Sequence, residues 1–120
     1  MRNQNFKVWG NSFSDEVWRY FEPFLREFKE LSIRHKFKFG IIIFPVRDQV
    51  EAKSLFNMPQ LRMRQITEEL EVPWLDVLPK LRELKLASYE HVFYDHCHYK
   101  PYGNELIADW IKEFLLREYL

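Results

Sequence analysis

The residues whose types and spacing best suit chemistry lie in the segment Asp95-His96-Cys97-His98. Asp95 precedes His98 by three residues, in a short loop between an apolar strand candidate and an amphipathic helix pattern. A carboxylate at this spacing can orient an imidazole so that it acts as a general base. Such a pair is half of a catalytic apparatus, because a hydroxyl nucleophile must still be supplied from elsewhere in the fold.

The same region also offers several groups that bind metals, namely His91, Asp95, His96, Cys97 and His98. Structural zinc requires four ligands in tetrahedral geometry, typically in pairs at short fixed spacings. In an extended segment, neighbouring side chains point to opposite sides, so Cys97 is expected to point away from His96 and His98. The sequence therefore predicts no metal site here, and it predicts that Cys97 is not a thiol nucleophile.

The elements that must position this loop alternate between strands and helices. We expect strands at 6–9, 37–44, 72–76 and 92–94, and a loop with at most one helical turn at 46–59. We expect helices at 14–34, 57–70, 79–86 and 103–116. Pro23 should kink the first of these helices or start a new segment. Alternation of this kind favours a mostly parallel sheet with helices on its faces. Ligands gather at the carboxyl ends of such strands, where Asn11, Pro45, Asp76 and Asp95 are expected.

Length and charge limit the alternatives. The chain has 120 residues, which predicts a single α/β domain over 1–120. Eighteen basic side chains balance eighteen acidic ones, so there is no basic excess for binding nucleic acid. The longest apolar run, 39–45, has the length of a strand and is too short to cross a bilayer. The single cysteine excludes an internal disulfide, and the compartment stays open.

From about residue 37 onward, the chain resembles the carboxy-terminal half of an SGNH (GDSL-type) hydrolase. The last signature of that family is an Asp, two residues, a His, and a Gly that opens the final helix, which here read Asp95, His98 and Gly103. The segments 40–45 and 75–79 are also similar. The resemblance implies a three-layer, flavodoxin-like parallel sheet that lacks its first strands. It also implies a serine esterase or O-acyl hydrolase or transferase, in which Asp95 orients His98 as the base and no cofactor is required.

The amino-terminal segment Gly10-Asn11-Ser12 fits this family in two ways. It superficially resembles the first block, with Ser12 as the nucleophile. However, only one helix separates it from the strand at 41, and this position fits the third block of the family better. In that case Asn11 is the oxyanion-hole donor, although the usual Gly-x-Asn-Asp of the third block is not present. The first two blocks would then precede Met1 and the nucleophile is unknown. The chain alone is then expected to be inactive or nearly so.

The resemblance implies a substrate that is an ester or an O-acetylated small molecule or carbohydrate, of a kind that the sequence leaves open. An alternative is a non-catalytic interaction or assembly module derived from the same fold. A sheet without its first strands has a bare edge, which favours pairing with a second copy or with a separate amino-terminal half. In that case, His98→Ala would change nothing functional.

Overall fold

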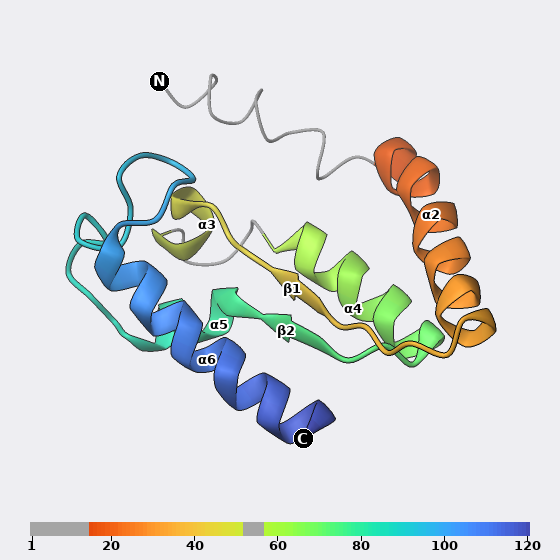
Figure 1. The fold of residues 1–120 in the computed structure, drawn as a ribbon. Helices are drawn as coiled ribbons and strands as arrows, with labels where there is room; N and C mark the ends of the chain where they lie inside the picture. The colour runs from red at the N-terminus through yellow and green to blue at the C-terminus, as the bar shows by residue number, and fades with distance from the viewer. Residues whose placement is uncertain (1–14, 52–56) are drawn as a thin grey trace. The chain divides into compact units, whose positions relative to one another are not determined.

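The computed structural model describes residues 15–51 and 57–120. These residues are mostly helical and include a small parallel sheet of two strands, β1 and β2, so the chain is a mixed α/β protein (Figure 1). The elements are α2 (Asp15–Arg34), β1 (Ile41–Ile43), α3 (Arg47–Glu51), α4 (Met58–Leu70), β2 (Trp74–Asp76), α5 (Val77–Glu83) and α6 (Pro101–Tyr119). Within the described residues, no helix combines the length and apolar content needed to cross a membrane.

The chain divides into two compact units, Met1–Ile41 with Asn57–Pro73, and Ile42–Phe56 with Trp74–Leu120. In the first unit, α2 and α4 are joined by the ion pair between Arg26 Nη2 and Glu69 Oε2, at 2.7 Å, and by a second ion pair between Asp15 and Arg62. The expected helices are present, and α2 continues through Pro23 instead of starting anew there. Asn57 is the N-cap of α4 as predicted, but its side chain makes no capping hydrogen bond.

The second unit contains a continuous hydrophobic core. Its buried residues come from α3, β2, α5, the segment 84–100 and α6: Val50, Leu75, Val77, Leu78, Leu81, Tyr89, Val92, Phe93, Ile107 and Phe114. In Figure 1, the segment 84–100 leaves α5, forms irregular loops and returns to the start of α6. The apolar spacing along α6 explains why this helix packs here, since residues three and four apart share one face. The loop that carries the candidate chemistry is therefore anchored at both ends in a packed core.

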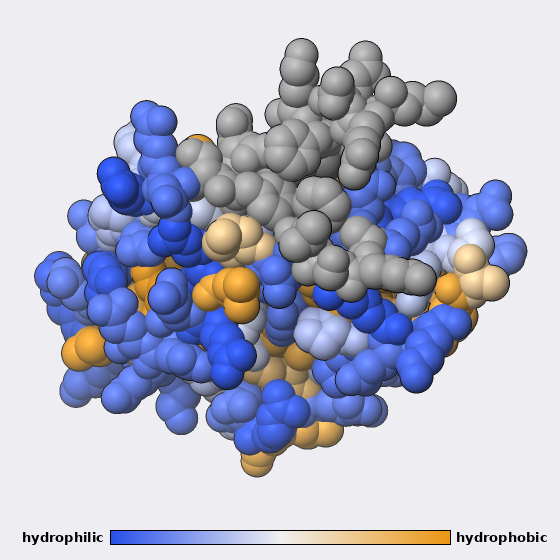
Figure 2. Space-filling view, turned by 180° about the vertical axis from the view of Figure 1, so that it is seen from behind, coloured by the Kyte–Doolittle hydropathy of each residue, from blue (hydrophilic) through white to orange (hydrophobic). Residues whose placement is uncertain are grey.

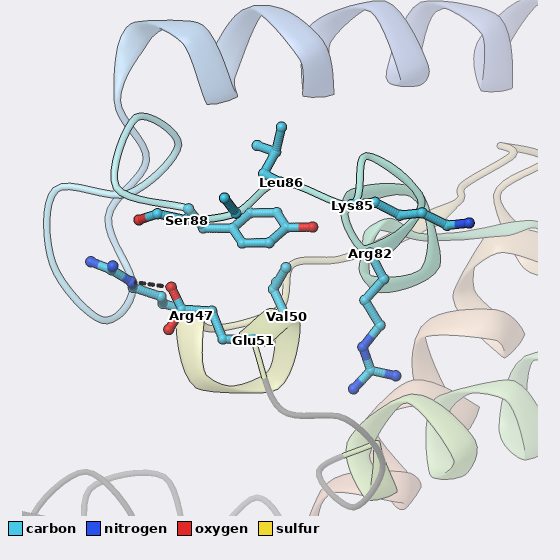
Figure 3. A pocket seen from close by; sticks show the side chains of 9 residues that line it. Arg47, Val50, Glu51, Arg82, Lys85, Leu86 and Ser88 are labelled. Carbon is cyan, nitrogen blue, oxygen red and sulfur yellow. Dashed lines mark hydrogen bonds and ion pairs between the residues drawn. The ribbon is translucent and has the colours of Figure 1, made fainter.

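Two short helices of this unit, α3 and α5, are held together by one arginine. Arg82 of α5 donates from Nε and Nη2 to the backbone oxygen of Gln49 in α3, at 3.2 and 2.7 Å. In the view of Figure 3, Val50 lies between Arg82 on one side and the ion pair of Arg47 with Glu51 on the other. The run 80–85 mixes charged and apolar residues, which is typical of a solvated helix face, but Leu81 is fully buried and Arg82 is half-buried.

The predicted strand 92–94 is not part of the sheet. Phe93 instead makes an isolated antiparallel bridge with Tyr99. The N–H of Tyr94 donates to the oxygen of His98 at 2.8 Å, and the N–H of Lys100 donates to the oxygen of Val92 at 2.7 Å. These bonds use the backbone groups that a strand would offer to a neighbouring strand. The apolar run 92–94 therefore closes the base of its own loop.

The described residues contain two strands of the larger sheet expected from the sequence, β1 within the predicted 37–44 and β2 within 72–76. The predicted strand 6–9 lies outside the described residues. Polar residues cover most of the face drawn in Figure 2, and hydrophobic residues show between them in small groups. Exposed apolar side chains include a series along α2: Val17, Tyr20, Phe21, Phe24, Phe28 and Leu31.

Candidate functional site

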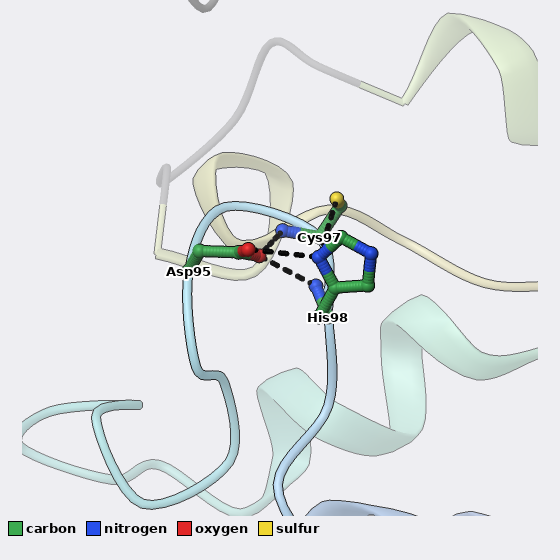
Figure 4. A group of neighbouring side chains, drawn as sticks. All are labelled: Asp95, Cys97 and His98. Carbon is green, nitrogen blue, oxygen red and sulfur yellow. Dashed lines mark hydrogen bonds and ion pairs between the residues drawn. The ribbon is translucent and has the colours of Figure 1, made fainter.

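The candidate site is a tight turn built on one carboxylate. Asp95 Oδ1 accepts two backbone hydrogen bonds, from the N–H of Cys97 at 2.9 Å and from the N–H of His98 at 2.8 Å (Figure 4). An Asp side chain that binds the backbone two and three residues ahead forms a local turn without help from a strand or helix. The turn brings residue 98 back toward residue 95, which an extended chain would not do.

The second oxygen of the same carboxylate contacts the imidazole. Asp95 Oδ2 lies 2.8 Å from His98 Nδ1. The hydrogen bonds from Cys97 N–H, then from His98, hold the pKa of Asp95 well below its ordinary value of 3.8. An ionised carboxylate can only accept hydrogen bonds, so in the neutral imidazole Nδ1 carries the proton and Nε2 carries the free electron pair. The His98 side chain is 74% exposed, which leaves Nε2 accessible from solvent.

Contacts from outside the turn fix its position next to the end of β1. The Tyr99 hydroxyl donates to the oxygen of Pro45 at 2.5 Å, and the N–H of Arg47 donates to the oxygen of His96 at 2.8 Å. Burial raises the pKa of Tyr99, so its hydroxyl stays a donor at all ordinary pH values. The turn therefore lies where β1 ends and where α3 begins.

The start of α6 supports the turn from the other side. A Cβ atom on Gly103 would lie 2.8 Å from the oxygen of Val92 and 3.3 Å from Tyr99 Cδ1. The absence of a side chain at this position lets α6 approach the backbone on which the turn is built. This close approach gives a physical reason for the glycine that the sequence placed at the opening of the final helix.

One sequence prediction about this turn is wrong. Cys97 does not point away from His98, because its Sγ atom lies 3.5 Å from His98 Nδ1 (Figure 4). The alternation of side chains expected for extended backbone does not hold here, since the bonds to Asp95 Oδ1 curl the chain. Partial burial and the neighbouring charge of Asp95 raise the pKa of the Cys97 thiol. The thiol is therefore protonated at neutral pH, which does not favour a role as nucleophile.

The structure brings together Asp95 and His98, and it does not describe the remaining predicted residues. Asn11 and Ser12 lie outside the described residues. In residues 15–51 and 57–120, the imidazole of His98 has hydrogen-bond partners in Asp95 and Cys97, and neither is a hydroxyl.

An open pocket of about 650 Å³ lies in the same unit, between α3, α5 and the segment 85–89. Its lining includes the apolar side chains of Val50 and Leu86, the ring of Tyr89, and the basic side chains of Arg47, Arg82 and Lys85. In Figure 3, Arg47 and Lys85 point to opposite sides of it. Arg47 follows the end of β1, where the sequence suggests either a pocket-lining role or a surface salt bridge, and it both lines this pocket and pairs with Glu51. Arg47 connects it to the turn through the bond to His96.

No protein-family model matches this chain, and no curated protein matches it either. The functional argument therefore rests on the turn itself.

Proposed function

We propose that this chain supplies the base and its orienting carboxylate to a serine hydrolase site of the SGNH type, which acts on ester bonds or O-acyl groups. The observation that supports the proposal is the 2.8 Å hydrogen bond between Asp95 Oδ2 and His98 Nδ1, with Nε2 open to solvent. An ionised carboxylate on Nδ1 fixes the tautomer in which Nε2 can take a proton.

In the proposed reaction, His98 Nε2 removes the proton of a serine hydroxyl as the oxygen attacks the ester carbonyl. His98 then gives that proton to the leaving alcohol, and a water molecule repeats the cycle to release the acid. Asp95 holds the imidazole in line and stabilises its charge. The serine comes from outside the described residues, and Asn11 is proposed as a donor to the oxyanion. No cofactor takes part in this scheme.

The fold of the proposed site is a single domain with a three-layer, flavodoxin-like sheet, to which β1 and β2 contribute two parallel strands. In open parallel sheets, ligands bind beyond the carboxyl ends of the strands. The turn meets this condition for β1, since Tyr99 binds the oxygen of Pro45, two residues after the strand ends. The substrate is an ester or an O-acetylated small molecule or carbohydrate.

The test is hydrolysis of a short-chain chromogenic ester at neutral pH. The chain is assayed alone and with a separately supplied amino-terminal half of an SGNH-type hydrolase that carries the serine block. We expect activity only in the combined preparation, and we expect His98→Ala to abolish it. His91→Ala is the matched control, because His91 is an exposed imidazole in the same loop region and takes no part in the site. Activity that survives His98→Ala would refute the proposal.

Activity of the chain alone that requires both His98 and Ser12 would place the nucleophile within this chain and correct the role of Asn11. Free imidazole hydrolyses activated esters slowly, so the rate with an equal concentration of imidazole is subtracted in each assay. Circular dichroism of each variant checks that a lost rate does not reflect a lost fold.

The second candidate function is a non-catalytic interaction or assembly module. The exposed apolar side chains of α2 favour it, since Tyr20 is 76% exposed and Phe24 is 55% exposed. Surfaces of this kind are common at protein–protein interfaces. This candidate expects association that rises with concentration in sedimentation experiments, is reduced by Phe24→Ser, and is unaffected by His98→Ala. A monomer at all concentrations, alone and with the supplied amino-terminal half, would exclude it.

A further inference from the structure

Three side chains of the turn, Asp95, Cys97 and His98, present three different metal-binding atoms to one point. The atoms Oδ, Sγ and a ring nitrogen all lie within 4.8 Å of one another. We infer that the turn is a binding site for a zinc-class divalent cation, and that the bound cation switches off the base at His98. The second part of this inference rests on the proposed function, whereas the first part does not.

The distances in the turn already approach those of a zinc centre. Zinc bonds of about 2.3 Å to sulfur and about 2.0 Å to nitrogen or oxygen, at tetrahedral angles, place S and N about 3.5 Å apart and N and O about 3.3 Å apart. The observed separations are 3.5 Å for Cys97 Sγ to His98 Nδ1 and 2.8 Å for Nδ1 to Asp95 Oδ2. For a cation to enter, Oδ2 and Nδ1 must open by about half an ångström, and Sγ and the carboxylate oxygen, which lie no more than 4.8 Å apart, must come to about 3.5 Å.

The backbone of the turn can stay in place while the metal binds. Asp95 uses Oδ1 for the N–H groups of Cys97 and His98, and it uses Oδ2 for the imidazole. A cation that displaces the proton on Nδ1 takes over Oδ2 and leaves Oδ1 with its two bonds. The ligands are therefore pre-organised by the same turn that orients the base, so little ordering entropy is lost on binding.

The charges of the site balance around a divalent ion. Asp95 is ionised, and Cys97 releases its thiol proton to solvent when it binds the metal. The two anionic ligands offset the charge of a 2+ cation. The neutral imidazole, bound through Nδ1, must carry its single proton on Nε2. The fourth position of the tetrahedron is left for water, as in zinc sites that keep an exchangeable ligand.

This last step has a functional consequence. An imidazole that carries a proton on Nε2 has no free electron pair there and cannot act as a base. Metal binding and base catalysis by His98 thus exclude each other. A cation of this class would act as a reversible inhibitor of the hydrolase, with Cys97 as the residue that adds this regulation to the pair of Asp95 and His98.

The test of binding is a titration of the reduced chain with cobalt(II), a spectroscopic substitute for zinc, followed by competition with zinc. Because Cys97 is the single cysteine, any thiolate-to-cobalt charge-transfer absorption reports on this residue. We expect one equivalent to bind at micromolar protein and zinc to displace it. We expect the absorption to vanish in Cys97→Ser, affinity to fall at least tenfold in His98→Ala, and His91→Ala to bind as the wild type does.

Absence of the absorption with cobalt in excess would overturn the inference. So would a spectrum unaffected by His98→Ala, or a stoichiometry of one metal per two chains, which would mean that the ion bridges copies. The inhibition is tested in the preparation that hydrolyses ester. For each variant, the rate of hydrolysis with added zinc is divided by its rate in the presence of a chelator, which removes the metal. We expect zinc to inhibit the wild type and Cys97→Ser to need at least tenfold more zinc. Binding without ester hydrolysis would refute the proposed function alone, and hydrolysis without binding would refute this inference alone.

Discussion

Replacement of Gly103 by alanine tests how the turn is supported, and the structure gives its size. The added Cβ would lie 2.8 Å from the oxygen of Val92 and 3.0 Å from Val92 Cγ1. The nearer atom belongs to the backbone, and the same oxygen already accepts the N–H of Lys100 at 2.7 Å, so it cannot move without loss of that bond. The start of α6 must therefore shift away from the segment that carries the turn.

The expected cost is a difference between two terms. Insertion of a methyl group into a packed contact costs about 1–3 kcal/mol. Alanine gains up to about 1 kcal/mol over glycine in a helix interior, and less in the first turn, where residue 103 lies. We therefore expect Gly103→Ala to lower the free energy of unfolding by about 1–2 kcal/mol. For a chain of this size, that corresponds to a fall in Tm of about 4–8 °C.

Urea unfolding followed by circular dichroism measures this difference. Glu105→Ala is the matched control, because Glu105 is exposed in the same helix and its replacement should change stability by less than about 0.5 kcal/mol. Gly103→Ala should also reduce ester hydrolysis in the combined preparation, since the shift reaches the turn through Tyr99. A Gly103→Ala variant as stable as the wild type would refute the close approach of α6 to Val92.

Two further side chains give predictions of a similar kind. Asp76 caps α5 by accepting from the N–H of Leu78, so Asp76→Ala should cost about 1 kcal/mol in thermal melts, whereas Asp76→Asn should keep the cap. Burial raises the pKa of Asp76 above 3.8 in the folded state. The folded wild type therefore binds this proton more tightly than the unfolded chain does, and its stability relative to Asp76→Asn should fall as pH rises from 3.8 through the raised pKa. A constant difference in stability between about pH 3 and 7 would contradict this. Tyr99→Phe should lower the free energy of unfolding in urea by about 1–3 kcal/mol, because it leaves the buried Pro45 oxygen without its donor. The control is Tyr94→Phe, at an exposed tyrosine, and a smaller loss for Tyr99→Phe than for this control would contradict the prediction.

Helices α2, α4 and α6 could be predicted from the sequence because their apolar spacing is long and regular, whereas α3 lies in the segment 46–59, where at most one helical turn was expected. Helix α6 extends beyond the predicted 103–116 at both ends, since Pro101 suits the first turn of a helix. Helix α5 begins two residues before the predicted 79, because Asp76 caps it. The spacing of Asp95 and His98 also predicted their contact, since three residues span one tight turn.

The remaining features depend on backbone bonds that the sequence does not display. The run 92–94 has the composition of a strand, yet its N–H and C=O groups pair with residues 98 and 100 of its own loop. Cys97 approaches His98 because Asp95 curls the backbone, which a rule for extended chains does not foresee. The pocket at α3 and α5 is lined by residues from separate parts of the chain, and the bond of Arg82 to Gln49 joins two residues far apart in the sequence.

The central claim is that Asp95 holds the proton of His98 on Nδ1 and leaves Nε2 as the base. Long-range proton–nitrogen NMR of the histidine rings measures this tautomer in the chain as it is, in metal-free buffer at a pH where His98 is neutral. The account predicts a protonated Nδ1 and an unprotonated Nε2 for His98, and a loss of this preference in Asp95→Ala with His91 unchanged. A proton on Nε2 in the wild type, or a tautomer indifferent to the loss of the carboxylate, would contradict it.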